Sequence, residues 1–347
     1  MLLGACSGEM QGEQARVALP TGHYEGPISF QGNELRVALD LREVTPGRLQ
    51  ADVSFPQVPG LEFEASRLSY QEPQLRLEQW PGQVGSVAVQ AVREGDFLRG
   101  VMNWENVRAD FVWVRRGEAG PREFQEQPLP LRYGGRAQAG RLLIPDDTLA
   151  QHPAVALFTT PAKQPSAQNK AMYLARHGFA TLVVVTPAPT DAADSSAYYS
   201  TQAVCAALRK QAAVDSGRVG CWVRGEVAPM VVAAAANQAR PAAFVVLEAV
   251  PVATREAASA YQVLGQQRIP TLALYAGLDT TVATAESARR LRPVLGYRGG
   301  TQIRTFPQAT AEFVQPGRVA PDGQWQWPRP TPGYWDGVLD WLRQTSR

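Results

Sequence analysis

The stretch Arg218-Val219-Gly220-Cys221-Trp222-Val223-Arg224-Gly225-Glu226-Val227-Ala228-Pro229 decides the fold of this chain. Its first half is a mostly apolar run, which is typical of a strand buried on both faces. The residues after it, 227–237, are small and apolar, and the proline near their start suits the first turn of a helix. A buried strand that runs through a glycine into a helix indicates an α/β fold.

The same alternation of strands and helices extends outward over residues 129–347. Apolar runs such as Ala180-Thr181-Leu182-Val183-Val184-Val185 predict strands covered on both faces. The predicted strands are 129–134, 137–144, 153–159, 179–185, 217–223, 242–248, 270–276 and 300–306. The predicted helices are 166–177, 197–213, 227–237, 283–295 and 331–345. This order predicts a mostly parallel sheet of about eight strands between two helical layers.

Residues 22–117 predict a separate, all-β domain. The run Glu34-Leu35-Arg36-Val37-Ala38-Leu39-Asp40-Leu41 alternates polar and apolar residues, as a half-buried strand does. Turn pairs such as Pro46-Gly47 and Pro59-Gly60 separate further short strands, so we expect a small antiparallel barrel or sandwich. The stretch 118–128, rich in proline, glutamate and glutamine, is expected to link it to the α/β domain that follows.

Three segments of the α/β domain resemble the α/β-hydrolase superfamily, in particular bacterial exported esterases and peptidase-like hydrolases with an N-terminal β-domain. Arg176-His177-Gly178-Phe179-Ala180 is similar to the entry into a central strand of that family. Residues 218–222 resemble the strand before the nucleophile elbow, and residues 270–282 resemble the strand and loop that carry the triad acid. The resemblance implies a three-layer sandwich with a Gly-x-Ser-x-Gly elbow, an acid and then a histidine.

The catalytic positions that this resemblance implies do not hold a complete triad. Gly225 stands at the nucleophile position and has no side chain that can attack a carbonyl. Asp279 occupies the acid position, and Ala311 occupies the position where the base is expected. All the histidines of the chain precede the elbow: His23, His152 and His177. The sequence therefore predicts a hydrolase scaffold with a degenerate triad.

Four residues around the elbow are candidates for a ligand-binding cleft: Thr160, Arg224, Glu226 and Asp279. Thr160 precedes Pro161, which has no backbone N–H and removes a potential oxyanion donor. Arg224 and Glu226 either pair with each other or contact a ligand at the edge of the sheet where open α/β sheets bind ligands. Asp279 either caps the following helix or serves in a remodelled pocket.

Composition excludes several classes of protein. The chain has 347 residues, 34 of them basic and 32 acidic, and this near balance argues against a nucleic-acid surface. With 45% hydrophobic residues the chain is not disordered, and no apolar run reaches the ~18–20 residues of a membrane-spanning helix. The His, Cys, Asp and Glu residues show no metal-ligand spacing, and no cofactor is implied.

The first residues predict a lipid anchor. Leu3-Gly4-Ala5-Cys6 resembles the bacterial lipobox, in which the cysteine is lipidated, so residues 1–21 are expected to form a lipoprotein-type N-terminus and tether. Five residues precede Cys6, so a complete signal peptide requires a start codon further upstream. We expect an exported protein of the cell envelope that meets the membrane only through this anchor. Cys205 and Cys221 are expected as buried core residues.

These observations lead to three hypotheses about function. The first is a non-catalytic binding protein, with a small acyl or peptide-like ligand in the cleft or a protein partner on the β-domain. The alternative is an esterase or amidase that works through non-standard residues: Asp279, Glu226, Glu312 or a threonine or serine side chain. The third is a structural component of the envelope.

Overall fold

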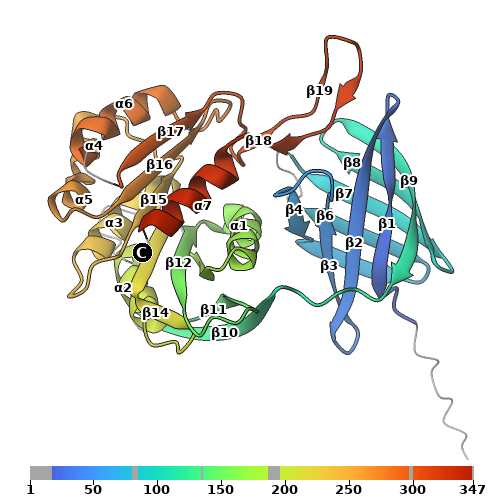
Figure 1. Cartoon of the computed structure of the whole chain (residues 1–347), viewed down its shortest axis with the longest axis horizontal. Coiled ribbons are helices and arrows are strands. Elements are labelled where there is room, and N and C mark those ends of the chain that lie inside the picture. The colour runs from blue at the N-terminus through green and yellow to red at the C-terminus, as the bar shows by residue number, and fades with distance from the viewer. Residues whose placement is uncertain (1–17, 80–84, 134–135, 187–195, 297–299, 346–347) are drawn as a thin grey trace, which may run out of the picture.

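The computed structural model describes residues 18–79, 85–133, 136–186, 196–296 and 300–345. They form two domains that lie side by side along the long axis of the molecule (Figure 1). The predicted anchor residue Cys6 lies outside the described residues. Within the described ranges, no helix is both long enough and apolar enough to cross a membrane.

The N-terminal domain is one antiparallel sheet that curls into a half-barrel, with the strand order β4-β3-β2-β1-β9-β8-β7-β6-β5. Its strands are β1 (Gly22–Phe30), β2 (Asn33–Thr45), β3 (Arg48–Ser54), β4 (Glu62–Glu64), β5 (Arg67–Gln71), β6 (Gln74–Gln79), β7 (Val87–Glu94), β8 (Phe97–Trp104) and β9 (Val107–Gly117). Alternate residues of β9 (Val107, Ala109, Phe111 and Trp113) are buried in the interior. The period-two pattern therefore places one face of each strand in the core.

The second domain contains a mixed sheet with the strand order β10-β11-β13-β12-β14-β15-β16-β17. Its strands are β10 (Phe124–Tyr133), β11 (Arg136–Pro145), β12 (His152–Thr159), β13 (Ala180–Val185), β14 (Val214–Arg224), β15 (Val245–Glu248), β16 (Thr271–Ala276) and β17 (Gln302–Phe306). Neighbours from β13 to β17 pair in parallel, but β10 with β11 and β11 with β13 pair antiparallel.

The expected mostly parallel sheet is therefore replaced by a mixed one, for a reason of chain length. Parallel neighbours need a crossover of about a dozen residues, and far fewer separate Tyr133 from Arg136. The two strands form a hairpin, and β10 already begins at Phe124, inside the stretch 118–128 that the sequence predicts as linker.

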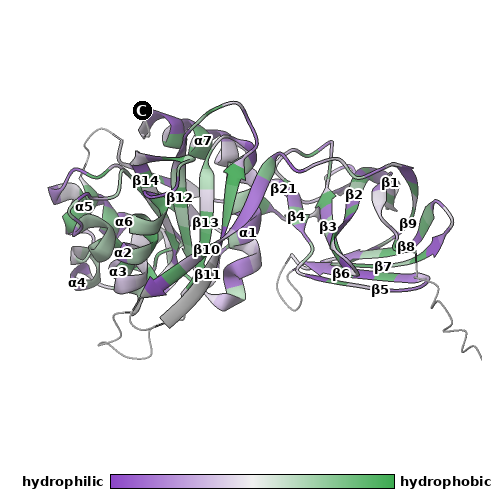
Figure 2. Ribbon diagram, turned by 90° about the horizontal axis from the view of Figure 1, so that it is seen from below, coloured by the Kyte–Doolittle hydropathy of each residue, from purple (hydrophilic) through white to green (hydrophobic). Residues whose placement is uncertain are grey.

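Helices cover both faces of this sheet, which gives three layers. One face packs against α1 (Gln164–Arg176) and α7 (Tyr334–Thr345). The other face packs against α2 (Ser196–Leu208), α3 (Ala228–Ala236), α4 (Arg255–Ser259), α5 (Gln262–Gln266) and α6 (Thr284–Leu295). Figure 2 shows the hydrophobic strands in the middle of this domain, between the helices of its two faces. A strand buried on both faces needs such a continuous apolar sequence.

Residues 314–330 form an arm that leaves the α/β domain and packs on the β-domain (Figure 1). The arm contains β18 (Val314–Gln315), β19 (Arg318–Val319), β20 (Trp325–Gln326) and β21 (Arg329–Pro330). Trp327 enters the core of the β-domain, where its ring lies 6.1 Å from that of Trp104 and its Nε1 donates to the carbonyl of Asn33 at 3.3 Å. The arm thus joins the two domains through apolar packing.

Candidate functional site

The strand order creates a crevice at one edge of the mixed sheet. From β12 the chain proceeds to β13 on one side and then to β14 on the other, so the loops after β12 and β14 diverge. Ligands of open α/β sheets bind at such a switch point, beyond the carboxyl ends of the strands. The loop after β12 carries Thr160, the loop after β14 carries Gly225, and the segments after β16 and β17 carry Asp279 and Ala311. The topology therefore places the four loops that carry the predicted site residues at one edge.

The turn after β14 has the backbone conformation of a tight elbow. Gly225 has φ +74°, in the left-handed region that glycine adopts without steric cost. A Cβ built at this position meets no heavy atom within 4 Å, so the space for a side chain is present. Gly225 opens the one-turn helix η2 (Gly225–Val227), which leads into α3. The turn keeps its shape without any side chain at its apex.

Asp279 lies in the loop after β16, and a glycine positions this loop. A Cβ on Gly277 would lie 2.4 Å from the carbonyl oxygen of Pro307, so only glycine lets the ends of β16 and β17 approach this closely. Asp279 is 6% exposed, and its Oδ1 accepts bonds from the backbone N–H of Thr281 at 2.9 Å and from the Thr281 hydroxyl at 2.6 Å. Its Oδ2 is buried and has no hydrogen-bond partner among the described residues.

A group of charges, most of them buried, occupies the region between the elbow and Ala311. We call this group the charge cluster, and its members are Lys163, Lys170, Arg224, Glu248 and Glu312. The Nη1 atom of Arg224 lies 3.1 Å from Glu248 Oε1 and 3.1 Å from Glu312 Oε2, and its Nη2 donates to the carbonyl of Ala311 at 3.0 Å. Arg224 therefore reaches across the site to Glu312 and not to its neighbour Glu226, which is exposed.

The rest of the charge cluster is equally well bonded. Lys170 Nζ lies 2.5 Å from Glu248 Oε1, and Trp222 Nε1 donates to Glu248 Oε2 at 2.7 Å. Glu312 also accepts bonds from Lys163 at 3.2 Å and from the hydroxyl of Ser166. Buried charges of both signs that satisfy each other in this way form a rigid network. Removing one partner from such a network leaves the opposite charge buried and uncompensated.

The electrostatics of the cluster keep Glu312 and Arg224 charged at neutral pH. Burial opposes ionisation of Glu312, but the positive charges of Arg224, Lys170 and Lys163 outweigh it and lower the pKa of Glu312 to about 2. Burial alone would lower the pKa of Arg224, but Glu312 and Glu248 raise it above its usual value. A general base works best with a pKa near the working pH, so neither residue is suited to that role.

A cleft of about 450 Å³ opens beside this cluster, between the two domains. Leu61, Trp104 and Glu105 of the β-domain and Lys163, Asp279 and Ala311 of the α/β domain belong to its wall. Of the candidate cleft residues, Asp279 lines this cleft, whereas Thr160, Arg224 and Glu226 do not. Thr160 precedes the one-turn helix η1 (Pro161–Lys163), and its carbonyl accepts the N–H of Lys163 at 3.0 Å. Among the described residues, no group of three or more His, Cys, Asp or Glu side chains is placed to hold a metal ion.

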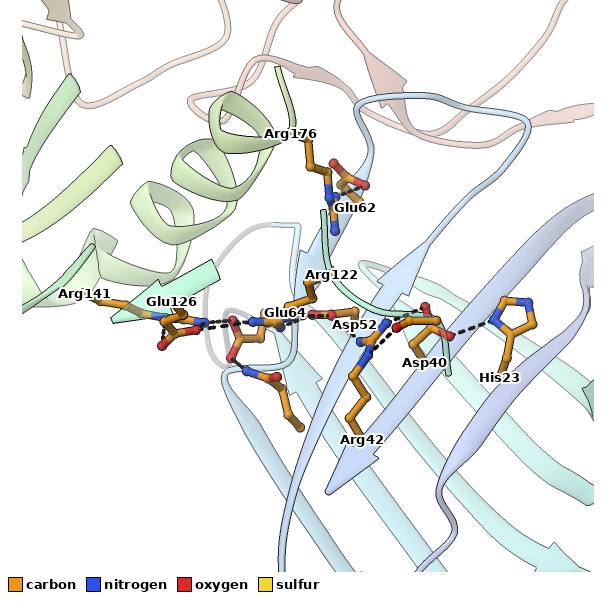
Figure 3. A network of polar contacts seen from close by, with 12 residues as sticks. His23, Asp40, Arg42, Asp52, Glu62, Glu64, Arg122, Glu126, Arg141 and Arg176 are labelled. Carbon is orange, nitrogen blue, oxygen red and sulfur yellow. Dashed lines mark hydrogen bonds and ion pairs between the residues drawn. The ribbon is translucent and has the colours of Figure 1, made fainter. Parts of the chain in front are cut away.

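A second set of charges, the interdomain network, joins the two domains (Figure 3). Its labelled members are His23, Asp40, Arg42, Asp52, Glu62, Glu64, Arg122, Glu126, Arg141 and Arg176. Arg122, between the domains, lies 2.5 Å from Asp52, and Arg141 of β11 lies 2.7 Å from Glu64 of β4. Arg176 of α1 pairs with Glu62 of β4. These bonds hold α1 and β11 against the edge of the half-barrel.

The sequence interpretation missed two members of the charge cluster, Glu248 and Lys170. Glu248 ends the otherwise apolar run 244–248, and a lone acid at the end of a buried strand is a signal of a buried partner. Lys170 is one of three lysines in the chain and falls on a buried face of its helix. No pattern in the sequence shows that these two residues meet each other, because 78 positions separate them.

Comparisons with known proteins find similar structures only. No protein-family model matches the chain, and neither does any curated protein. A putative dienelactone hydrolase from Klebsiella pneumoniae is 14% identical over 64% of this chain and 99% of its own, with a TM-score of 0.46. A dienelactone hydrolase-like promiscuous phosphotriesterase from metagenomic libraries is 17% identical over 64% and 99%, with a TM-score of 0.47.

A match over most of this chain comes from a larger protein. The AtxE2 isopeptidase, in a variant with Astexin3-dC4 bound, is 12% identical over 89% of this chain and 61% of its own, with a TM-score of 0.46. These neighbours have esterase-like or hydrolase-like folds. Identities this low and TM-scores below 0.5 carry no activity over to this chain.

Proposed function

We propose that this chain is a non-catalytic binding protein on a hydrolase-like scaffold, and that the interdomain cleft holds its ligand. One observation carries the proposal. Arg224, Glu248 and Glu312 form buried ion pairs beside an elbow that has glycine at its apex. Acyl transfer needs a nucleophile, a base that takes its proton and an acid that orients the base. Gly225 and Ala311 supply neither of the first two functions.

The remaining polar groups do not replace the missing ones. Arg224 cannot accept a proton at neutral pH. Glu312 is a weak base because its pKa is about 2, and Arg224, Lys163 and Ser166 already occupy its oxygens. Asp279 is the one triad position with its chemistry intact, but its Oδ1 is bonded to Thr281. The site therefore supports binding better than turnover.

The alternative, an esterase or amidase with non-standard residues, has one candidate pair. Lys170 Nζ lies 3.4 Å from the hydroxyl of Ser166, and serine–lysine pairs can act as nucleophile and base. However, Ser166 is 4% exposed and donates its proton to Glu312, and Lys170 is held by Glu248. Both groups of the pair are thus bonded to carboxylates of the charge cluster, so we favour the binding protein.

Labelling with a fluorophosphonate, which forms a covalent adduct with an activated serine, tests this choice. We expect no adduct on the full chain by intact mass, under conditions that label a known serine hydrolase completely. An adduct that disappears in Ser166→Ala would overturn the proposal and assign the nucleophile to Ser166.

We propose the cell envelope as the location of the protein, with Cys6 as the lipid-anchored residue. The support is the sequence Leu3-Gly4-Ala5-Cys6 alone. In a bacterial host that carries the gene with its upstream genomic sequence, we expect palmitate to be incorporated into the protein and to be lost in Cys6→Ala. Incorporation that persists in Cys6→Ala, or none in either form, would overturn this part of the proposal.

A further inference from the structure

We infer that the ligand of the interdomain cleft is a small amphipathic amine, with an apolar body and a protonated nitrogen that binds Asp279 and Glu105. This inference rests on the proposed binding function and names the class of ligand for the same cleft. Three properties of the cleft lead to it: its apolar wall, the excess of acidic over basic side chains in that wall and a buried carboxylate oxygen without a donor.

The apolar wall accommodates the body of the ligand. Trp104, Leu61 and Val314 line the cleft from the β-domain and the arm, and Leu278 lines it from the loop after β16. Leu278 is 49% exposed, which leaves a large apolar side chain in contact with solvent at this place. The volume of about 450 Å³ lies within the usual range for small-molecule sites, which are lined mainly by apolar side chains.

The charged groups of the wall are not balanced. Glu312 is compensated by Arg224 and Lys163, at 3.1 and 3.2 Å. Asp279 and the exposed Glu105 also line the cleft, and neither forms an ion pair in the part of the chain that the structure describes. The charge of Asp279 acts on Arg224 from a longer distance and helps to raise its pKa. Partial burial raises the pKa of the Glu105 carboxyl, because no cation offsets its loss of water. A ligand cation would supply the missing charge.

The hydrogen bonding of Asp279 points to a donor on the ligand. Thr281 satisfies Oδ1, but no described group donates to the buried Oδ2. A buried acceptor without a donor is costly, and the cost is recovered when a donor arrives. An ammonium group has three donors and no acceptor, so it suits two carboxylates. A carboxylate or phosphate ligand would instead meet like charges in a partly desolvated cleft.

Calorimetric titration of the full chain at pH 7 with three probes of equal chain length tests the inference. The probes are decylamine, decanol and decanoate, which share the apolar body and differ in the charge of the head. We expect decylamine to bind about tenfold or more tightly than the other two, as expected for hydrogen bonds between charged groups. Decanoate is expected to bind most weakly.

Isosteric variants then test whether the two carboxylates cause the preference for decylamine. Asp279→Asn and Glu105→Gln should each weaken decylamine binding about tenfold and leave decanol binding unchanged. Glu226→Gln is the matched control, because Glu226 is an exposed carboxylate outside the cleft wall, and it should change nothing. Thermal unfolding of each variant shows that the fold is kept.

The possible outcomes distinguish a failure of the amine inference from a failure of the proposed binding function. If decanol or decanoate binds as tightly as decylamine, or if the carboxylate variants bind decylamine as well as the parent does, the amine inference is overturned and the binding function stands. If none of the three probes binds, the cleft is not a site for small apolar ligands and the proposed function itself fails.

Discussion

At the scale of single residues, Gly225 combines the shape of a catalytic elbow with the absence of its chemistry. The left-handed φ of +74° strains any residue except glycine, and an enzyme accepts that strain in return for an exposed nucleophile. Glycine stabilises the turn.

Replacing Gly225 by serine should therefore place a hydroxyl at the apex without creating an enzyme. No heavy atom lies within 4 Å of the new Cβ, so the fold should survive at a cost of about 1 kcal/mol for the left-handed conformation. Urea unfolding measures this cost, and hydrolysis of chromogenic esters measures activity. Turnover above background in Gly225→Ser would mean that a base is present and that Ala311 has been wrongly assigned to its position.

Glu312→Gln should destabilise the protein by about 3–5 kcal/mol, because it leaves the buried Arg224 without its main partner. The effect should depend on pH. The folded-state pKa of Glu312, about 2, lies below the unfolded value of roughly 4.3, so its stabilisation is complete above the unfolded pKa and is lost as the pH falls towards 2.

Unfolding curves between pH 7 and pH 2 test both parts of this prediction. The parent should lose stability more steeply on acidification than Glu312→Gln. The control is Glu226→Gln, at an exposed position close to Arg224 in the sequence. It should change stability by less than about 0.5 kcal/mol. Parallel pH profiles for the parent and Glu312→Gln would contradict the ion-pair assignment.

At the scale of elements, the arm of residues 314–330 links the stability of the two domains. Trp327 is 9% exposed and completes the core of a half-barrel that its own strands leave open at that point. We expect Trp327→Ala to cost about 3–5 kcal/mol, as for other buried aromatic deletions. Val319→Ala, in the same arm but 55% exposed, should cost far less. Equal effects of the two changes in chemical unfolding would show that the arm does not pack as described.

Helices and strands with a clear periodicity could be predicted from the sequence, whereas long-range contacts could not. The strand and helix of the elbow, the alternating strands of the half-barrel and the helix of residues 334–345 follow from local periodicity. The two-residue strands of the arm have no periodicity to detect. The charge cluster was not predicted because it depends on contacts over 78 and 88 positions, as between Lys170 and Glu248 or Arg224 and Glu312. The local pairing of Arg224 with Glu226 was the simpler hypothesis, and it does not occur.

At the scale of the whole molecule, the cleft exists only while the two domains keep their positions. Arg122 bonds to Asp52 through two nitrogens, at 2.5 and 2.9 Å, and lies 3.4 Å from Glu64. Its side chain is 10% exposed and thus belongs to the interface and not to the surface. The cleft is therefore a product of the interdomain network as much as of its own wall.

Arg122→Met should loosen the interface, because it leaves Asp52 and Glu64 with fewer positive partners while it keeps an unbranched side chain of moderate length. Small-angle scattering should show a larger radius of gyration, and proteolysis should cut faster within residues 118–123. Arg67→Met, which removes an arginine that is 72% exposed, should leave both measurements unchanged. An unchanged radius and cutting rate in Arg122→Met would mean that other contacts hold the domains.

The central claim is that a hydrolase-like scaffold here binds and does not turn over. Its most direct test is the rate at which the purified full chain hydrolyses a panel of short- and long-acyl chromogenic esters and amides, beside Asp279→Ala. The account predicts no rate above that control for any member of the panel. A saturable rate that Asp279→Ala abolishes would show that chemistry survives at this site and would contradict the claim.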